Sequence, residues 1–359
     1  MNTVKQVIPA AAINLVGFSL LEPCTPMHRF FPSWYNVWEA WLHKQANAKA
    51  GSDQWLFRRF GIDSEMLPEE ALRKANYRGW LNDMSAACAQ AVAQLGSKGE
   101  FRLRNERNAL IYCDSWGEAS VFEGVNSWRD SLSVDILPKG IVRDYGIKDF
   151  TCKLRGERNG LLSALRMAQD CLNSNMADNV IICGQFRSFP VLVFSEAEHF
   201  PSSSKRGPIP ANSQFSVERV GCLILKKQPG QGVALHLSDY QALSGSTQRR
   251  ALQLADHCKR YLARDTQAVL GVTPPALSFR AVQRQAFEQL PASLACVSLS
   301  ELYGDSGCMN PALAWQYLLQ SNITGHSLLS VLDGEGGAWL LENWIPQACH
   351  LLSNQRGTS

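Results

Sequence analysis

The sequence predicts a layered α/β fold built from two similar halves, residues 1–230 and 231–359. The chain has 359 residues, 45% of them hydrophobic and 19% charged, which suits a large globular core. Buried strand patterns alternate with helical patterns, as expected for parallel sheets covered by helices on both faces. This alternation starts again near residue 230, which indicates a duplicated architecture.

The N-terminal part gives the weaker signals. Residues 7–21 are apolar, but Pro9 interrupts them and bulky aromatics follow, so a first β-strand is favoured over a cleaved signal peptide. Residues 27–60 are rich in aromatic side chains, which form either a cap on the core or part of a partner interface or acyl pocket. Small residues at 84–95 predict a helix, and 108–113 predict a buried strand. An irregular segment to about residue 148 is expected to serve an interface or a site.

The middle of the chain has the clearest pattern. Residues 160–173 carry leucine and alanine at helical spacing, and Ala177-Asp178 then forms a turn into a buried strand at 179–184. A polar, proline-containing loop precedes another buried strand at 220–226. Beyond residue 232 the predicted strands are 233–237, 268–272, 294–298, 327–332 and 338–342, and the predicted helices are 247–263, 279–290 and 311–319.

Composition and motifs exclude several classes of function. A net charge of +3 without a basic tract argues against nucleic-acid binding. No P-loop or G-x-G-x-x-G motif follows a predicted strand, so no nucleotide cofactor is expected. The 11 cysteines form no C-x-x-C pair and the seven histidines are isolated, which argues against zinc and disulfides and fits a reducing cytoplasm. No uncharged apolar stretch is long enough to span a membrane.

Three segments together resemble the β-ketoacyl synthases of the thiolase-like condensing-enzyme superfamily. Residues 158–184 resemble the family's nucleophile elbow, helix and strand, and residues 217–226 resemble its "GEGAG…LVLE" strand. Residues 303–319, YGDSGCMNPALAWQYLL, resemble its "GHTEAASGLAGLL" segment. The resemblance covers most of residues 84–342 and implies a five-layered α/β/α/β/α fold.

The family's chemistry needs a cysteine thiolate at the N-terminus of a buried helix, with two histidines to stabilise the oxyanion and promote decarboxylation. Counting without gaps from Ala164, and independently from Ala177-Asp178, places Arg158 at the nucleophile position. The first histidine falls in residues 274–278, which contain none; the lysine position falls near Ser300, and the second histidine corresponds to Asp305. The resemblance therefore implies no catalytic residues. A buried arginine needs a partner, and Asp305 is the expected one for Arg158.

Cys152 is the alternative nucleophile, because it precedes the same helix, but using it breaks both gap-free counts. Cys308 could line the remnant pocket, and residues 334–337, G-E-G-G, replace the family's "GFGG" gate or simply form a tight turn between strands.

The resemblance implies a non-catalytic partner, similar to a chain-length factor, that forms a heterodimer with an active ketosynthase and works with an acyl carrier protein. We expect this dimer to join edge to edge through the strand at 179–184, whose apolar side chains favour an interface. An acyltransferase or decarboxylase with an unconventional site is the alternative, and a homodimeric scaffold is a third possibility. The missing histidines favour the non-catalytic partner.

Overall fold

The computed structural model describes residues 8–9, 11–60, 72–73, 77–115, 139–148, 150–156, 158–201, 213–227 and 232–353. Among these residues, one sheet of eleven strands dominates the fold, with the order β12-β11-β13-β14-β9-β1-β8-β6-β4-β5 and β10 paired to β14. A separate three-stranded sheet has the order β2-β3-β7. The mixed α/β architecture predicted from the sequence is confirmed.

The described strands have the following bounds: β1 (Ile13–Leu21), β2 (His28–Arg29), β3 (Gln54–Arg58), β4 (Asn108–Asp114), β5 (Phe150–Arg155), β6 (Asn179–Phe186), β7 (Ser213–Val217), β8 (Arg219–Lys226), β9 (Val233–Leu237), β10 (Gln241–Ala242), β11 (Thr266–Val272), β12 (Ala295–Ser298), β13 (Gly325–Leu332) and β14 (Gly337–Ile345). The helices are α1 (Val37–Ala50), α3 (Tyr77–Ala93), α4 (Gly96–Asn105), α7 (Lys139–Asp144), α8 (Gly160–Asn173), α9 (Pro190–Glu198), α10 (Thr247–Tyr261), α11 (Leu277–Phe287), α12 (Leu299–Tyr303), the 3-10 turn η1 (Gly307–Met309), α13 (Ala312–Gln320) and α14 (His350–Ser353).

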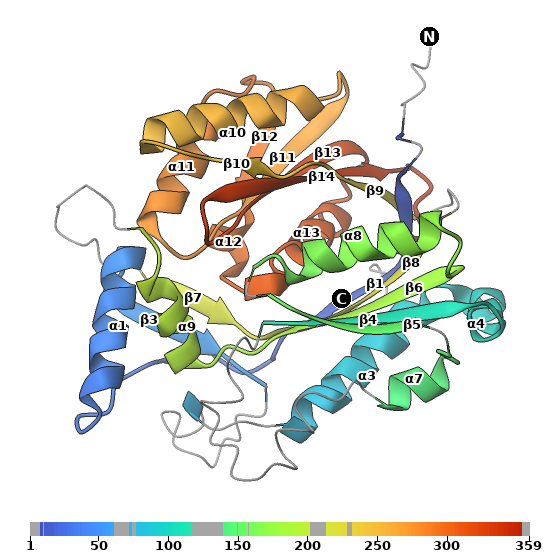
Figure 1. The fold of residues 1–359 in the computed structure, drawn as a ribbon, viewed down its shortest axis with the longest axis horizontal. Helices are drawn as coiled ribbons and strands as arrows, with labels where there is room; N and C mark the ends of the chain where they lie inside the picture. The colour runs from blue at the N-terminus through green and yellow to red at the C-terminus, as the bar shows by residue number, and fades with distance from the viewer. Residues whose placement is uncertain are drawn as a thin grey trace.

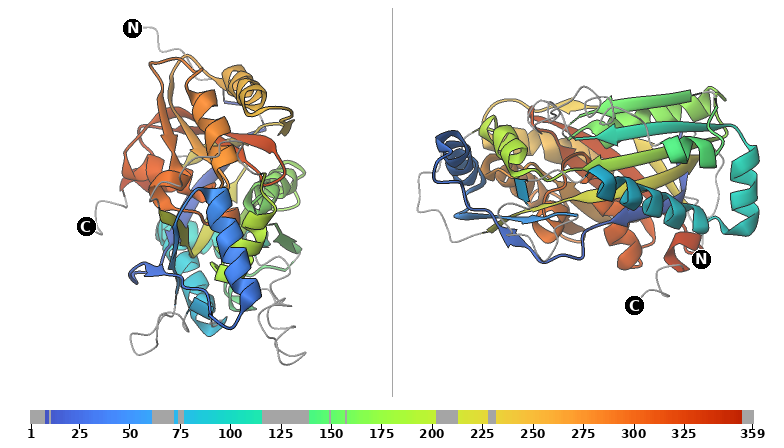
Figure 2. Two further views of the ribbon diagram at one scale, coloured as in Figure 1. Left: turned by 90° about the vertical axis from the view of Figure 1, so that its left-hand side faces the viewer. Right: turned by 90° about the horizontal axis from the view of Figure 1, so that it is seen from below.

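The helices form layers around the long sheet. In Figure 1, α8 and α13 lie between the upper strands β9–β14 and the lower strands β1, β4, β5, β6 and β8. Helices α10 and α11 cover the outer face of the upper strands, and α3 and α7 cover the outer face of the lower ones. Figure 2 shows the same separation from two further sides. The two parts join where β1 pairs with β9, so the predicted halves share a continuous sheet. The division near residue 230 itself stays a prediction.

Burial explains the central helices. Helix α8 buries nine of its residues, among them Leu161, Leu165 and Leu172, because it contacts strands of both parts of the sheet. Helix α13 likewise buries Leu313, Trp315 and Leu318. A helix that is apolar on most of its surface belongs in the interior of a protein. The sequence therefore places these two helices in the central layer.

Strand β6 does not lie where the sequence analysis expected it. Its predicted role as a dimer edge is wrong, because β6 pairs with β4 on one side and with β8 on the other. The edge strand on this side of the sheet is β5, which lies beyond β4 and among the described residues pairs only with it. An apolar strand is equally suited to an interior place between two neighbours. Any pairing across this edge of the sheet must use β5.

The aromatic segment near the N-terminus divides into a buried and an exposed set. Phe30, Trp55 and Phe57 are buried and pack around Phe194 of α9, as expected for a cap on the core. Other aromatic side chains at the start of α1 stay exposed, and Trp34 is the most exposed of them at 92%. The exposed set comprises Phe31, Trp34, Tyr35, Trp38 and Trp41. The cap interpretation thus holds for the buried set, and a partner interface at the exposed set stays a prediction.

The structure contains two helices that the sequence analysis did not predict, and some predicted segments lie outside the described residues. Helices α7 and α9 lie in segments that the sequence analysis treated as irregular. The rest of the predicted irregular segment, 116–138, lies outside the described residues, as do Pro208 and Pro210 of the polar loop. None of the described helices combines the length and apolarity that a transmembrane span requires.

Candidate functional site: a buried arginine–carboxylate network

Arg158 lies immediately before α8, at the position that the sequence analysis assigned to the nucleophile. Arg158 lies in the connection between edge strand β5 and α8, and Asn159 is the N-cap of the helix. Its side chain is only 5% exposed. A guanidinium stays protonated in proteins and cannot form an acyl-enzyme. The helix N-terminus, which would favour a thiolate, instead faces a cation.

Two carboxylates hold the Arg158 side chain. Its Nη1 and Nη2 donate to Asp305 Oδ1 and Oδ2 at 2.5 and 3.1 Å, and its Nε and Nη2 donate to Glu196 Oε1 and Oε2 at 2.8 and 2.9 Å. Both contacts are bidentate, the geometry in which arginine binds carboxylates most strongly. The expected pairing with Asp305 is confirmed. Glu196, which comes from α9, was not anticipated because no motif or periodic pattern links it to Arg158.

Backbone contacts fix Asp305 in place. Its N–H donates to Phe215 O at 2.9 Å, and its C=O accepts from Val217 N at 2.9 Å, so it forms a one-residue parallel bridge to Ser216 of strand β7. Gly304 precedes it with φ +77°, and a Cβ there would lie 2.9 Å from Phe215 Cβ. Asn310 Nδ2 donates to Asp305 Oδ1 at 2.7 Å. The carboxylate is therefore positioned by its own backbone before Arg158 reaches it.

The electrostatics of this network favour the charged arginine. Burial alone would lower the pKa of Arg158, but the adjacent charges of Asp305 and Glu196 raise it above its ordinary value. Burial raises the pKa of Glu196, while the guanidinium acts against that rise. The two carboxylates are engaged by the cation and by Asn310, so neither is placed as a free base. The arrangement serves to stabilise the fold at this point and offers no nucleophile.

The other predicted positions lie outside this network. Ser300 lies in α12, where its Oγ accepts from Thr273 N at 2.9 Å and donates to Thr273 O at 3.1 Å. It therefore ties α12 to the end of β11. Residues 274–278 follow β11 and are mostly buried, and they offer no imidazole.

The two candidate cysteines have different surroundings. Cys308 is fully buried, its Sγ donates to Gln185 O at 3.2 Å, and burial with the neighbouring Cys113 thiol raises its pKa well above the ordinary range. It lies against the start of α8, since a Cβ on Gly160 would be 3.3 Å from Cys308 Cβ. Cys152 is partly buried within β5 and is not at the helix N-terminus. The structure gives neither thiol the environment of an activated nucleophile.

The glycine-rich segment after β13 forms a tight turn. Asp333 Oδ1 accepts hydrogen bonds from the backbone N–H groups of Glu335, Gly336 and Gly337 at 3.0, 2.7 and 2.7 Å. Gly336 has φ +101°, which an L side chain rarely adopts. These contacts explain the glycines at 334–337 by the geometry of a tight turn between two strands, which is one of the two interpretations given in the sequence analysis.

A second buried ion network is centred on Glu218, which belongs to the 217–226 segment that resembles a family strand. Glu218 is fully buried, and its Oε1 accepts from Arg187 Nε at 2.6 Å and lies 3.6 Å from Arg59 Nε. Its Oε2 accepts from Phe60 N at 2.6 Å. The Arg59 guanidinium also stacks over Phe189 at 4.0 Å. One carboxylate thus serves two buried arginines, a cluster that the sequence analysis missed.

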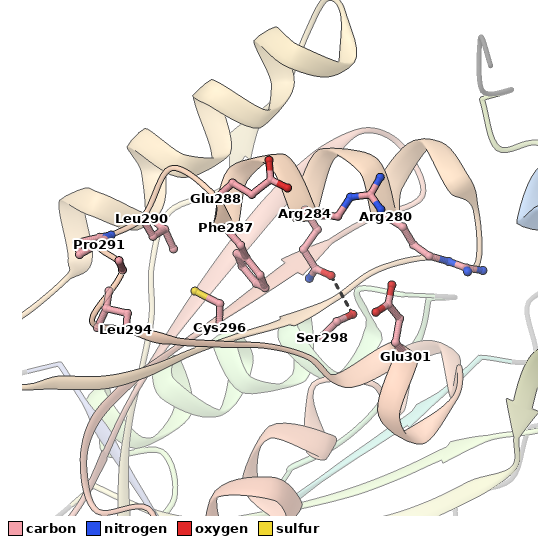
Figure 3. Close-up of a pocket in the computed structure, with 12 residues that line it drawn as sticks. Arg280, Arg284, Phe287, Glu288, Leu290, Pro291, Leu294, Cys296, Ser298 and Glu301 are labelled. Atoms are coloured by element: carbon pink, nitrogen blue, oxygen red, sulfur yellow. Dashed lines mark hydrogen bonds between the residues drawn. The ribbon is translucent and has the colours of Figure 1, made fainter.

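A separate cavity of about 590 Å³ lies between α11 and edge strand β12. Figure 3 shows Phe287 and Leu290 on its helix side and Cys296 on its strand side, with Arg284 and Glu301 toward its polar end. Ser298 Oγ donates to Gln283 Oε1 at 3.1 Å within it. The cavity is built from different elements than the Arg158 network, so the two are distinct features of the fold.

Comparison with known proteins identifies the fold. The sequence matches no family model and no curated protein. Among solved structures, the ishigamide ketosynthase/chain length factor is 14% identical with a TM-score of 0.58, covering 93% of this chain and 99% of that one. The acyltransferase ChlB3 is 14% identical with a TM-score of 0.57, covering 95% and 99%. FabH, the 3-oxoacyl-(acyl carrier protein) synthase III of Pseudomonas aeruginosa, is 13% identical with a TM-score of 0.51, covering 93% and 99%.

These similarities extend over nearly the whole chain at low sequence identity. They establish that the chain has the fold of the thiolase-like condensing enzymes, as the three sequence segments predicted. Similar folds host different activities, so the function must be argued from the residues at the site.

Proposed function

We propose that this chain is a non-catalytic, ketosynthase-like subunit that partners an active ketosynthase in polyketide or fatty-acid-type biosynthesis in the cytoplasm. The observation that carries the proposal is the place of Arg158, which stands before α8 and is held by Asp305 and Glu196. A condensing enzyme of this fold needs a thiolate there. A buried, doubly paired arginine excludes both a thiolate and an acyl group from that position.

An acyltransferase with Cys152 as its nucleophile is the alternative. One solved structure with this fold carries the name acyltransferase, which keeps this alternative open at the level of fold. The position of Cys152 weighs against it, because the residue sits inside β5 instead of at a helix N-terminus. The seven histidines of the chain do not occupy a family position that could activate it. We therefore favour the partner role.

Two surface features support association with another subunit. Among the residues that the structure describes, strand β5 is an edge of its sheet, and strand edges are templates for pairing with a second chain. Around the start of α1, the exposed aromatic residues include Trp34 and Tyr35, at 92% and 76% exposure. Large exposed aromatics are typical of interfaces. We propose that the ketosynthase pairs along β5 and that an acyl carrier protein delivers acyl chains to the resulting dimer.

The first prediction concerns acyl transfer to the isolated chain. Incubation with acyl carrier protein thioesters is expected to give no stable acyl-enzyme, because Arg158 replaces the nucleophile and Cys308 is buried with a raised pKa. Intact-mass spectrometry followed by peptide mapping measures this directly. An adduct on Cys152 or Cys308 would make the chain an enzyme and reverse the proposal. An active ketosynthase assayed in parallel shows that the thioester is competent.

The second prediction concerns the partner. Co-expression with a ketosynthase encoded next to this chain is expected to give a stable heterodimer by size-exclusion chromatography and native mass spectrometry. Thr151→Asp places a charge at an exposed position of β5 and is expected to weaken the heterodimer, because charged side chains on an edge oppose strand pairing. Gln248→Asp, at an exposed position of α10, is the matched control. A monodisperse monomer that ignores the ketosynthase would contradict the partner role without bearing on the acylation result.

A further inference from the structure

Three cysteines from separate elements converge beneath the lower part of the sheet. Cys88 comes from α3, Cys183 from β6 and Cys222 from β8, and their Sγ atoms all lie within 4.8 Å of one another. The Cys88 and Cys183 sulfurs are 3.5 Å apart. Cys183 and Cys222 are directly opposite in the antiparallel β6–β8 pair, and α3 packs over that face of the sheet. Two paired strands and one helix therefore place three thiols within one small buried space.

The surroundings of this thiol triad are dry and mostly apolar. Cys183 is fully buried and the other two cysteines are 1% exposed. Met84, Ala87, Ile181 and Ile224 belong to the same buried cluster. Tyr145 is partly buried and packs against this cluster.

The sulfurs of the triad are already close together. The Cys88 and Cys183 sulfurs lie within hydrogen-bond distance, and the strand register holds Cys222 opposite Cys183. Three sulfurs held by separate elements of the fold form a preorganised set of ligands. Cys258 is equally buried, but it lies outside this group and packs as a small apolar residue.

We propose that Cys88, Cys183 and Cys222 form a three-sulfur binding site for Cu(I). Soft thiolate ligands select soft ions, and Zn²⁺ in a structural site takes four ligands. Among the described residues, the group contains three cysteines and no fourth histidine or carboxylate ligand. Sulfurs about 2.3 Å from a trigonal ion lie about 4.0 Å apart, close to the spacing of this triad. Low-coordinate Cu(I) therefore suits the site better than zinc.

Binding requires no change of oxidation state. Cu(I) forms three Cu–S bonds, and the protons of the Cys88, Cys183 and Cys222 thiols pass to solvent. Because protons leave on binding, the affinity for Cu(I) is expected to increase with pH. The site is closed, so an ion enters during folding or through local opening of α3 over the sheet. The inference is independent of the proposed partner role.

Oxygen-free titration of the full chain with Cu(I), against a Cu(I) chelator, tests the site. The parent protein carries Cys24→Ser and Cys296→Ser, which remove the two exposed thiols. We expect one Cu(I) per chain and an X-ray absorption spectrum with three sulfurs at about 2.3 Å. Uptake of no copper, or coordination by only two sulfurs, would overturn the proposal.

Variants of the parent locate the bound ion. Cys88→Ala and Cys222→Ala are each expected to lower Cu(I) affinity by more than about tenfold, as for losses at metal sites. Cys258→Ala, in α10, is the matched control, because Cys258 is equally buried and outside the triad. Equal affinity in all three variants would place the copper elsewhere and refute the assignment. If a triad variant fails to fold, the sulfur count from the parent spectrum still decides.

Discussion

Arg158→Met is expected to lower the free energy of unfolding by about 3–5 kcal/mol, the range for breaking a buried ion pair. The methionine fills much of the arginine's volume but leaves Asp305, which is 1% exposed, without its cation. Asn310 still donates to Asp305, yet one amide does not offset a buried negative charge. Urea unfolding followed by circular dichroism measures the change, with the m-value checking that both proteins unfold in the same way.

Two further variants define the cause of this loss. Arg107→Met removes an arginine that pairs with Asp178 at 54% and 42% exposure, so a change of only about 0–1 kcal/mol is expected. Arg158→Met combined with Asp305→Asn removes the more buried of the two carboxylate charges that lose Arg158, and is expected to recover part of the stability. If Arg158→Met costs no more than Arg107→Met, the network does not stabilise the fold and the interpretation of Arg158 as a structural residue loses its physical basis.

The pairing of Arg158 with Asp305 could be predicted because two constraints act together. The motif counts placed both residues at one site, and a buried guanidinium requires an anion. Glu196 could not be predicted, since it lies 38 residues from Arg158 along the chain in a helix without a motif. Only the tertiary placement of α9, which packs on α1, brings its carboxylate into reach of Arg158.

The dimer edge was placed wrongly because an apolar sequence indicates that a strand is buried, but does not indicate whether its own chain or a partner buries it. Strand β6 is buried through its full length, but by neighbours on both sides within its own chain. Strand β5, FTCKLR, mixes polar and apolar residues and gave no clear signal, although such mixing is ordinary at an edge. Strand order depends on long-range pairing, which local periodicity does not encode.

The thiol triad was missed for a related reason. The sequence analysis searched for ligands at short spacing, as in C-x-x-C, whereas Cys88 and Cys183 are 95 residues apart. Cysteines in apolar strands are correctly interpreted as core residues one at a time. Their convergence is a property of the register between β6 and β8 and of the helix above them.

Glu218→Gln is the second change with a large expected effect, a loss of about 3–5 kcal/mol in the free energy of unfolding. The amide keeps the size of the side chain and can still accept from Phe60 N, so packing is little altered. What disappears is the negative charge shared by Arg187 and Arg59, both 1% exposed. The two guanidiniums then lose this anion in the interior, and neither can lose its proton.

The matched control is Glu106→Gln, which removes a carboxylate paired with Lys226 at the surface, at 32% and 27% exposure. Screening by solvent limits that pair to about 0–1 kcal/mol. Urea unfolding of the two variants beside the parent chain therefore separates the removal of a buried charge from the amide substitution itself. Similar losses in both would show that the arginines of the Glu218 network are solvated or otherwise neutralised. A much larger loss in Glu218→Gln would show that the buried charge of Glu218, just before strand β8, stabilises the fold in addition to the apolar residues of that strand.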